Sequence, residues 1–190
     1  MSRFKIVGGG ILGAVVLVGG GAAAFYMHTH PQIHIVNTTG KDGVTVTIDG
    51  EVVAASLANA ANESPGATVA PRIGSGSHKI EAKDATGKVI DTATFEFKSG
   101  SNGYLYAPGH DAKVCFILQT DQYSTNSAMP GLSDRYKTLD PSKHLWEMAE
   151  SIDYWFQDSP QSVSISNKGP STVTKHALRQ TRCGDPAFKD

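Results

Sequence analysis

Charge is scarce in this sequence. Only 18% of the 190 residues are charged, and the formal net charge is −1. A nucleic-acid-binding protein needs clustered lysine and arginine to neutralise phosphates, and this chain has no basic excess. Nucleic acid is therefore excluded as a partner. The sequence also lacks a phosphate-binding loop and a calcium loop of D-x-D-x-D-G type. We expect no cofactor and no catalytic residue.

Cysteine is almost absent, because Cys115 and Cys183 are the only two in the chain. An even number of cysteines in an exported protein favours a disulfide, and two buried free thiols are the alternative. A bond between these two residues would close a loop of roughly 70 residues and stabilise the fold by about 4 kcal/mol. Neither cysteine lies near the N-terminus, which excludes a lipoprotein.

The first 30 residues contain one long apolar segment, from Ile6 to Met27, without a charged residue. As a helix its 22 residues would extend roughly 33 Å, enough to cross a bilayer core. Arg3 and Lys5 precede it, so the positive-inside bias keeps the N-terminus cytoplasmic. The segment predicts a single-pass anchor over residues 1–30 and a periplasmic or extracellular domain over residues 31–190.

Two further features of this segment bear on the anchor. The run Ala22-Ala23-Ala24 resembles a signal-peptidase site, so secretion after cleavage near Ala24 is the alternative to a retained helix. Gly9 and Gly13 have the spacing that lets two membrane helices approach closely, which predicts a homo-oligomer contact. Other envelope proteins are the remaining expected partners.

The exported part is rich in alternating β-branched residues. Val44, Val46 and Ile48 alternate with threonine and aspartate, which is typical of a half-buried strand. Asp49-Gly50 then predicts a two-residue hairpin turn. The uninterrupted apolar run Val114–Leu118 predicts a central strand covered on both faces. We therefore expect a mainly β fold, an antiparallel β-sandwich.

One amphipathic helix is expected near the C-terminus, over residues 141–157. Asp140 and Pro141 suit its N-cap and first position. Apolar residues follow at helical spacing and would form one buried stripe: Leu145, Met148, Ala149, Ile152, Trp155 and Phe156. Short strands are then predicted at 163–166 and 172–175.

The region from Ile33 to Phe97 resembles a known family. A strand ending in Ile48-Asp49-Gly50, followed by the G-x-H-x-I-x-A pattern of Gly76–Ala82, is similar to PEGA-type and carboxypeptidase-regulatory-like β-sandwich modules. The Pro-Glu-Gly-Ala signature that names the first of these is absent. The resemblance implies a small extracytoplasmic domain that is tethered to a membrane and has no catalytic activity.

Two histidine groups are candidate chemical sites. His28, His30 and His34 have a spacing that could present imidazoles to a metal ion, although polar residues at the headgroup interface are the simpler interpretation. His78 follows Ser75 and Ser77, but the sequence there is not the G-x-S-x-G of a nucleophile elbow. Neither group predicts catalysis.

Aromatic side chains offer the remaining candidate surface. Trp146, Tyr104 and Tyr106 are the residues we expect to contact a partner or a glycan, because exposed tyrosine and tryptophan are enriched at interfaces. The sequence thus predicts a non-enzymatic, membrane-anchored binding or assembly protein of the cell envelope. The alternatives are a periplasmic or secreted enzyme whose site is assembled from distant loops, and a glycan-binding module.

Overall fold

The computed structural model describes residues 21–60, 68–110, 113–124, 134–166 and 171–188. This part of the chain is mainly β, as predicted, and forms three four-stranded sheets that follow a short helix over residues 21–29. Within the described ranges, no helix has the length and apolar character needed to cross a membrane. Most of the predicted anchor, including Gly9 and Gly13, lies outside the described residues.

Sheet I is the middle layer, with the strand order β10-β7-β1-β4. The strands are β10 (Leu145–Glu147), β7 (Tyr104–Tyr106), β1 (Ile33–Val36) and β4 (Thr68–Val69). The β1–β7 pair is parallel and the others are antiparallel. Because neighbouring side chains point to opposite faces, Tyr104 and Tyr106 enter one hydrophobic cluster and Leu105 enters another.

Sheet II covers one face of sheet I and has the order β3-β2-β5-β6. Its strands are β3 (Glu51–Leu57), β2 (Val44–Ile48), β5 (Gly76–Lys83) and β6 (Val89–Phe97), all antiparallel. The predicted hairpin turn is confirmed, because Asp49 and Gly50 both have positive φ angles, 52° and 86°. These two layers face each other as in the predicted sandwich, but the third sheet and two parallel strand pairs depart from the predicted antiparallel arrangement.

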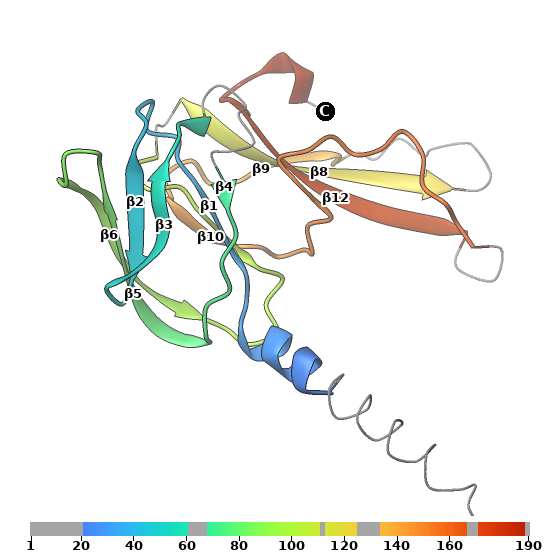
Figure 1. The fold of residues 1–190 in the computed structure, drawn as a ribbon. Helices are drawn as coiled ribbons and strands as arrows, with labels where there is room; N and C mark the ends of the chain where they lie inside the picture. The colour runs from blue at the N-terminus through green and yellow to red at the C-terminus, as the bar shows by residue number, and fades with distance from the viewer. Residues whose placement is uncertain (1–20, 61–67, 111–112, 125–133, 167–170, 189–190) are drawn as a thin grey trace, which may run out of the picture.

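Sheet III lies against the other face of sheet I (Figure 1). Its strand order is β11-β12-β8-β9. Its strands are β11 (Tyr154–Trp155), β12 (Thr172–Arg182), β8 (Val114–Ser124) and β9 (Tyr136–Thr138), and a short 3-10 helix follows at Pro186–Phe188. Strands β8 and β12 pair along their full length and project as a long arm (Figure 1). The predicted Cys115–Cys183 disulfide is present near the end of this ladder that adjoins the body.

Three strand predictions need correction in this part of the chain. Only the first part of β8 is buried as a central strand would be, and from Leu118 onward buried and half-buried residues alternate. Strand β12 continues to Arg182, well beyond the predicted 172–175, because it has an eleven-residue partner in β8. Residues 163–166 are not a strand.

The helix predicted over residues 141–157 is wrong. This segment instead contains β10, a turn region and β11. Asp140 accepts bonds from the N–H and hydroxyl of Ser142, which closes a turn and caps no helix. Leu145 and Trp146 pack into different clusters on opposite faces of sheet I. Pairing with β7 therefore determines the local structure, and the helical spacing of the apolar residues does not.

Candidate functional site

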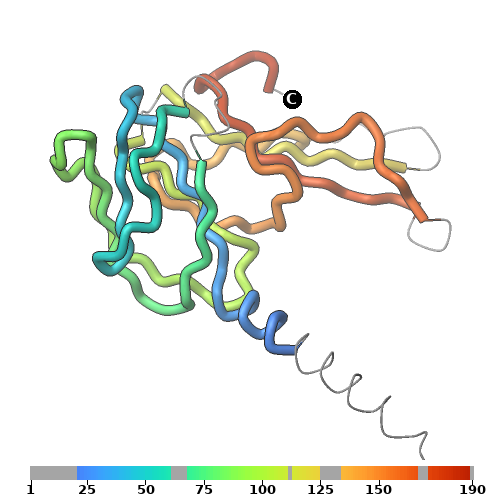
Figure 2. Tube along the Cα trace, viewed as in Figure 1, coloured from blue at the N-terminus to red at the C-terminus, as the bar shows by residue number. Residues whose placement is uncertain are grey.

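The end of the N-terminal helix is joined tightly to the β domain. The last carbonyl groups of a helix have no partner within the helix and need one elsewhere. Here segments far along the chain donate to them: Gly100 N–H to His28 O (2.8 Å), Ser75 N–H to Thr29 O (2.8 Å) and Arg72 Nη1 to His30 O (2.9 Å). We call this set of contacts the helix–domain junction. These bonds hold the end of the helix against the domain, and Figure 2 shows the helix pointing away from it.

Gly100 is the tightest point of the junction. Its φ angle is +71°, and a β-carbon added there would lie 2.7 Å from Cε1 of His28. Alanine at this position would combine an unfavourable backbone conformation with a contact that the exposed His28 side chain must move to relieve.

We expect Gly100→Ala to loosen the junction and to increase proteolysis between the helix and Pro31. The matched control is Gly87→Ala, because Gly87 has a similar φ of +84° with open space around it. Both variants carry the backbone cost of about 1 kcal/mol, and only Gly100→Ala displaces His28. Limited proteolysis followed by mass spectrometry makes the comparison. Equal cleavage in the two variants would contradict the junction.

Three apolar residues of the helix are exposed although the molecule has a well-packed interior. Phe25, Tyr26 and Met27 are 69%, 49% and 53% exposed. They continue the apolar run that begins at Ile6. Large exposed apolar side chains in a row usually contact a membrane or a partner, and tyrosine favours the interface between lipid and water.

A cleft of about 450 Å³ opens beside the junction. Residues 98–102 line one side, and Glu147, Met148 and Ala149 line the other. Lys98 Nζ lies 2.6 Å from Glu147 Oε2 across the cleft, and both side chains are partly exposed. Glu147 raises the pKa of Lys98 by accepting its hydrogen bond. Asn102 donates a hydrogen bond to Ala149 O and so links the two sides of the cleft.

The three N-terminal histidines do not converge on a metal site. His28 packs against Gly100, and His30 stacks on Tyr26 with ring centroids 4.0 Å apart. His34 lies in β1, and its ring stacks on that of Trp155 with centroids 3.5 Å apart and the planes nearly parallel. In the ranges that the structure describes, no group of three or more potential ligands surrounds a common point.

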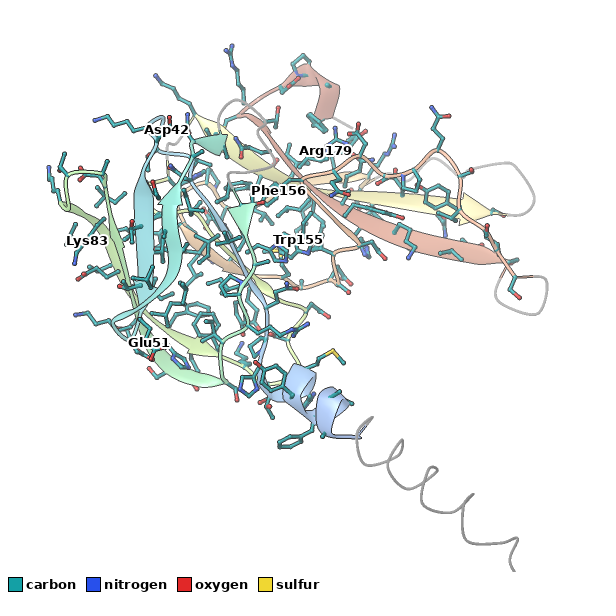
Figure 3. All side chains as sticks on the ribbon, viewed as in Figure 1. Asp42, Glu51, Lys83, Trp155, Phe156 and Arg179 are labelled. Carbon is teal, nitrogen blue, oxygen red and sulfur yellow. A yellow bond between two sulfur atoms is a disulfide. The ribbon has the colours of Figure 1, made fainter. Side chains whose placement is uncertain are left out.

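Trp155 of sheet III (Figure 3) stacks on His34 of sheet I, and this contact joins the two sheets. Burial lowers the pKa of His34 from 6.5 to about 4, because the imidazolium loses hydration in this position. The ring is therefore neutral in the folded protein at neutral pH.

We expect the free energy of unfolding to fall as the pH decreases from 6.5 to about 4. In that interval the unfolded chain binds a proton at His34 that the folded chain does not bind. The free energy of unfolding therefore changes by at most roughly 1.4 kcal/mol per pH unit. Urea unfolding at several pH values measures it. His34→Phe keeps an aromatic ring on Trp155 and should remove this part of the dependence. Identical pH profiles for the two proteins would contradict the assignment.

The serines near His78 are not arranged as a nucleophile and base. Both ring nitrogens of His78 are bonded, one to Asp49 Oδ2 at 2.6 Å and the other to Gly74 O at 2.8 Å. The Ser75 hydroxyl accepts a hydrogen bond from Ser99. The hydrogen bond from the N–H of Lys79 lowers the pKa of Asp49, and the bond to His78 lowers it further. This group fixes the hairpin turn against β5.

The predicted aromatic interaction surface is not formed, because all three residues are buried. Tyr104 and Tyr106 lie between sheets I and II, and Trp146 lies between sheets I and III. Each polar atom has a partner inside: Tyr104 Oη accepts from Lys98 N–H, Tyr106 donates to Asp91 and Trp146 donates to Asp140 O. Buried tyrosine and tryptophan side chains usually keep such bonds. All three residues are buried because they lie in short strands of sheet I, which is covered on both faces.

Sequence reasoning missed one group of polar residues. Asp91 Oδ2 accepts from the Tyr106 hydroxyl at 3.1 Å and lies 2.9 Å from His144 Nδ1. The Asp91 side chain is 8% exposed and that of His144 is 43% exposed. Burial and the Asp91 carboxylate raise the pKa of Tyr106 far above its usual range. The three residues are far apart in sequence, so no motif indicates the group.

No family model matches the chain, and no curated protein or solved structure matches it. The resemblance to PEGA-type modules therefore rests on the motifs of Ile33–Phe97 alone. In the fold, that stretch supplies all of sheet II together with β1 and β4.

Proposed function

We propose that the protein is a non-enzymatic, membrane-anchored binding or assembly protein of the cell envelope. Its N-terminus is cytoplasmic, and its β domain lies in the periplasm or outside the cell. The chain crosses the membrane once, through the apolar segment that ends near Met27. Its partners are other envelope proteins, and Gly9 and Gly13 offer a contact between two copies.

One observation carries this proposal: an exposed apolar helix end that is bonded to the domain. Phe25, Tyr26 and Met27 face solvent, while the carbonyls just beyond them are bonded to the domain. A flexible leader would not need such bonds. The helix also continues without a break through Ala24, which supports a retained anchor over cleavage at that point.

A topology reporter tests the orientation. Alkaline phosphatase fused to the C-terminus is active only outside the cytoplasm, so we expect high activity in intact cells. Reversing the charge before the apolar segment, with Arg3→Glu and Lys5→Glu together, should reduce that activity because the positive-inside bias is lost. An inactive fusion of the unaltered chain that is nevertheless abundant would contradict the proposal.

The Asp91–His144 pair favours enzymatic activity as the second candidate function. A buried carboxylate that holds Nδ1 of a half-exposed histidine leaves Nε2 available as a general base. Hydrolysis of small ester substrates by the purified chain, lost in His144→Ala and in Asp91→Asn, would favour this function. Activity that is absent, or unchanged in both variants, would exclude His144 as such a base.

A further inference from the structure

We propose that the cleft between residues 98–102 and 147–149 binds the headgroup of a phospholipid that carries a phosphate and a primary ammonium group. Phosphatidylethanolamine is the lipid that fits this description. The inference rests on the proposed membrane anchor, and it assigns a ligand to the surface of the domain that adjoins that anchor.

The position of the cleft is the first argument. Gly100 lines the cleft and also donates its N–H to His28 O at the end of the helix. His28 directly follows the exposed residues Phe25, Tyr26 and Met27. One helical turn advances about 5 Å, so the cleft lies within about one turn of the side chains expected at the lipid–water interface. Because several hydrogen bonds hold the end of the helix to the domain, the cleft stays at the level of the lipid–water interface.

The charges of the cleft are the second argument. Lys98 and Glu147, which are in direct contact, place one positive and one negative group in the lining of a cleft of about 450 Å³. This volume is in the range of small-molecule sites. Lys98 complements a phosphate, and Glu147 accepts hydrogen bonds from an ammonium group. The Lys98 and Glu147 side chains are 62% and 34% exposed, and an exposed ion pair contributes little to stability. A zwitterionic ligand can therefore replace it at little cost.

A buried serine hydroxyl among the residues that line the cleft is the third argument. Ser101 lines it, and its oxygen is buried without a hydrogen-bond partner in the described residues. A buried hydroxyl without a partner is unfavourable. A phosphate oxygen of the ligand would accept from Ser101 after a small movement of the loop. A choline headgroup lacks ammonium N–H donors for Glu147, and a glycerol headgroup lacks the positive charge, so both fit less well.

The experiment uses the full chain in nanodiscs that contain equal amounts of phosphatidylethanolamine, phosphatidylcholine and phosphatidylglycerol. After the protein is released from the nanodiscs, native mass spectrometry measures how many molecules of each lipid remain bound to it. We expect about tenfold preferential retention of phosphatidylethanolamine, the factor at the lower end of the range for one hydrogen bond to a charged group. Glu147→Ala should abolish the preference, and Lys98→Ala should reduce retention of all three lipids. Lys175→Ala is the matched control, because Lys175 on β12 forms a similar 2.6 Å ion pair with Asp153, which directly precedes β11.

Each other outcome has a defined meaning. A chain that does not insert into the nanodiscs contradicts the proposed function. A chain that inserts but retains the three lipids equally, or whose Lys98→Ala variant behaves like Lys175→Ala, overturns the headgroup site alone. Glycerophosphoethanolamine provides the soluble arm. If it binds the chain in lipid-free detergent while the lipid is not retained in nanodiscs, the ligand is a soluble compound and the lipid assignment is wrong.

Discussion

Replacing both cysteines by alanine is expected to lower the free energy of unfolding by about 4 kcal/mol. Cys115 lies in β8 and Cys183 follows β12, so their bond closes a loop with a sequence separation of 68 residues. In the unfolded chain the bond removes the conformations in which the two ends are far apart, and this is its main stabilising effect. Denaturant unfolding of the full chain in detergent measures the loss.

Reduction of the unaltered protein provides the control for this prediction. Because no other cysteine exists in the sequence, the reduced protein and the double variant should have the same unfolding midpoint. The eleven-residue ladder between β8 and β12 also holds the two ends together. If the midpoint does not change in either case, that ladder alone fixes the arm and the disulfide adds nothing to stability.

Tyr104→Ala is expected to have a similarly large effect, about 3–5 kcal/mol. Tyr104 is fully buried between sheets I and II, with its ring in edge contact with Phe95 and Phe97. Truncation removes the ring contacts, leaves a cavity and removes the acceptor of the Lys98 N–H. Thermal or denaturant unfolding of the full chain measures the change.

Tyr104→Phe separates the ring from the hydroxyl. Only the hydrogen bond to Lys98 N–H is lost in this variant, so we expect a cost of about 0.5–1.5 kcal/mol. If Tyr104→Ala left stability unchanged and weakened binding to a partner, the residue would belong to an interaction surface, as the sequence first suggested, and its assignment to the core would be wrong.

Short-range patterns in the sequence were sufficient to predict strand β2 and the hairpin turn that follows it. The alternation of Val44, Val46 and Ile48 with polar residues corresponds to one buried and one solvent-facing side of β2. Asp49-Gly50 indicated the hairpin because few residue pairs tolerate two positive φ angles. The lone cysteine pair likewise predicted the disulfide.

The predicted helix failed because its evidence was entirely local. Leu145, Met148 and Ile152 have helical spacing, yet the same segment pairs with β7, which lies about forty residues earlier in the chain. No residue pattern within the segment reports that pairing. The same limit applies to Trp146, which we expected on an interaction surface. Pairing of its strand with β7 buries it instead.

The candidate sites were missing from the sequence analysis for a related reason. The His34–Trp155 stack and the Asp91–His144 pair each join residues from different sheets or their loops. The helix–domain junction likewise depends on Gly100, whose role appears only when the turn after β6 meets the helix. Such contacts depend on the order of strands within and between sheets, which local patterns do not determine.

The central claim is that the N-terminal segment is retained as the anchor of an exported domain. The most direct measurement is the intact mass of the protein extracted from the membrane fraction of its own cells. We predict a membrane-bound species that includes the apolar segment from Ile6 to Met27. A mature protein that begins at Phe25 and is recovered in the soluble fraction would contradict the claim.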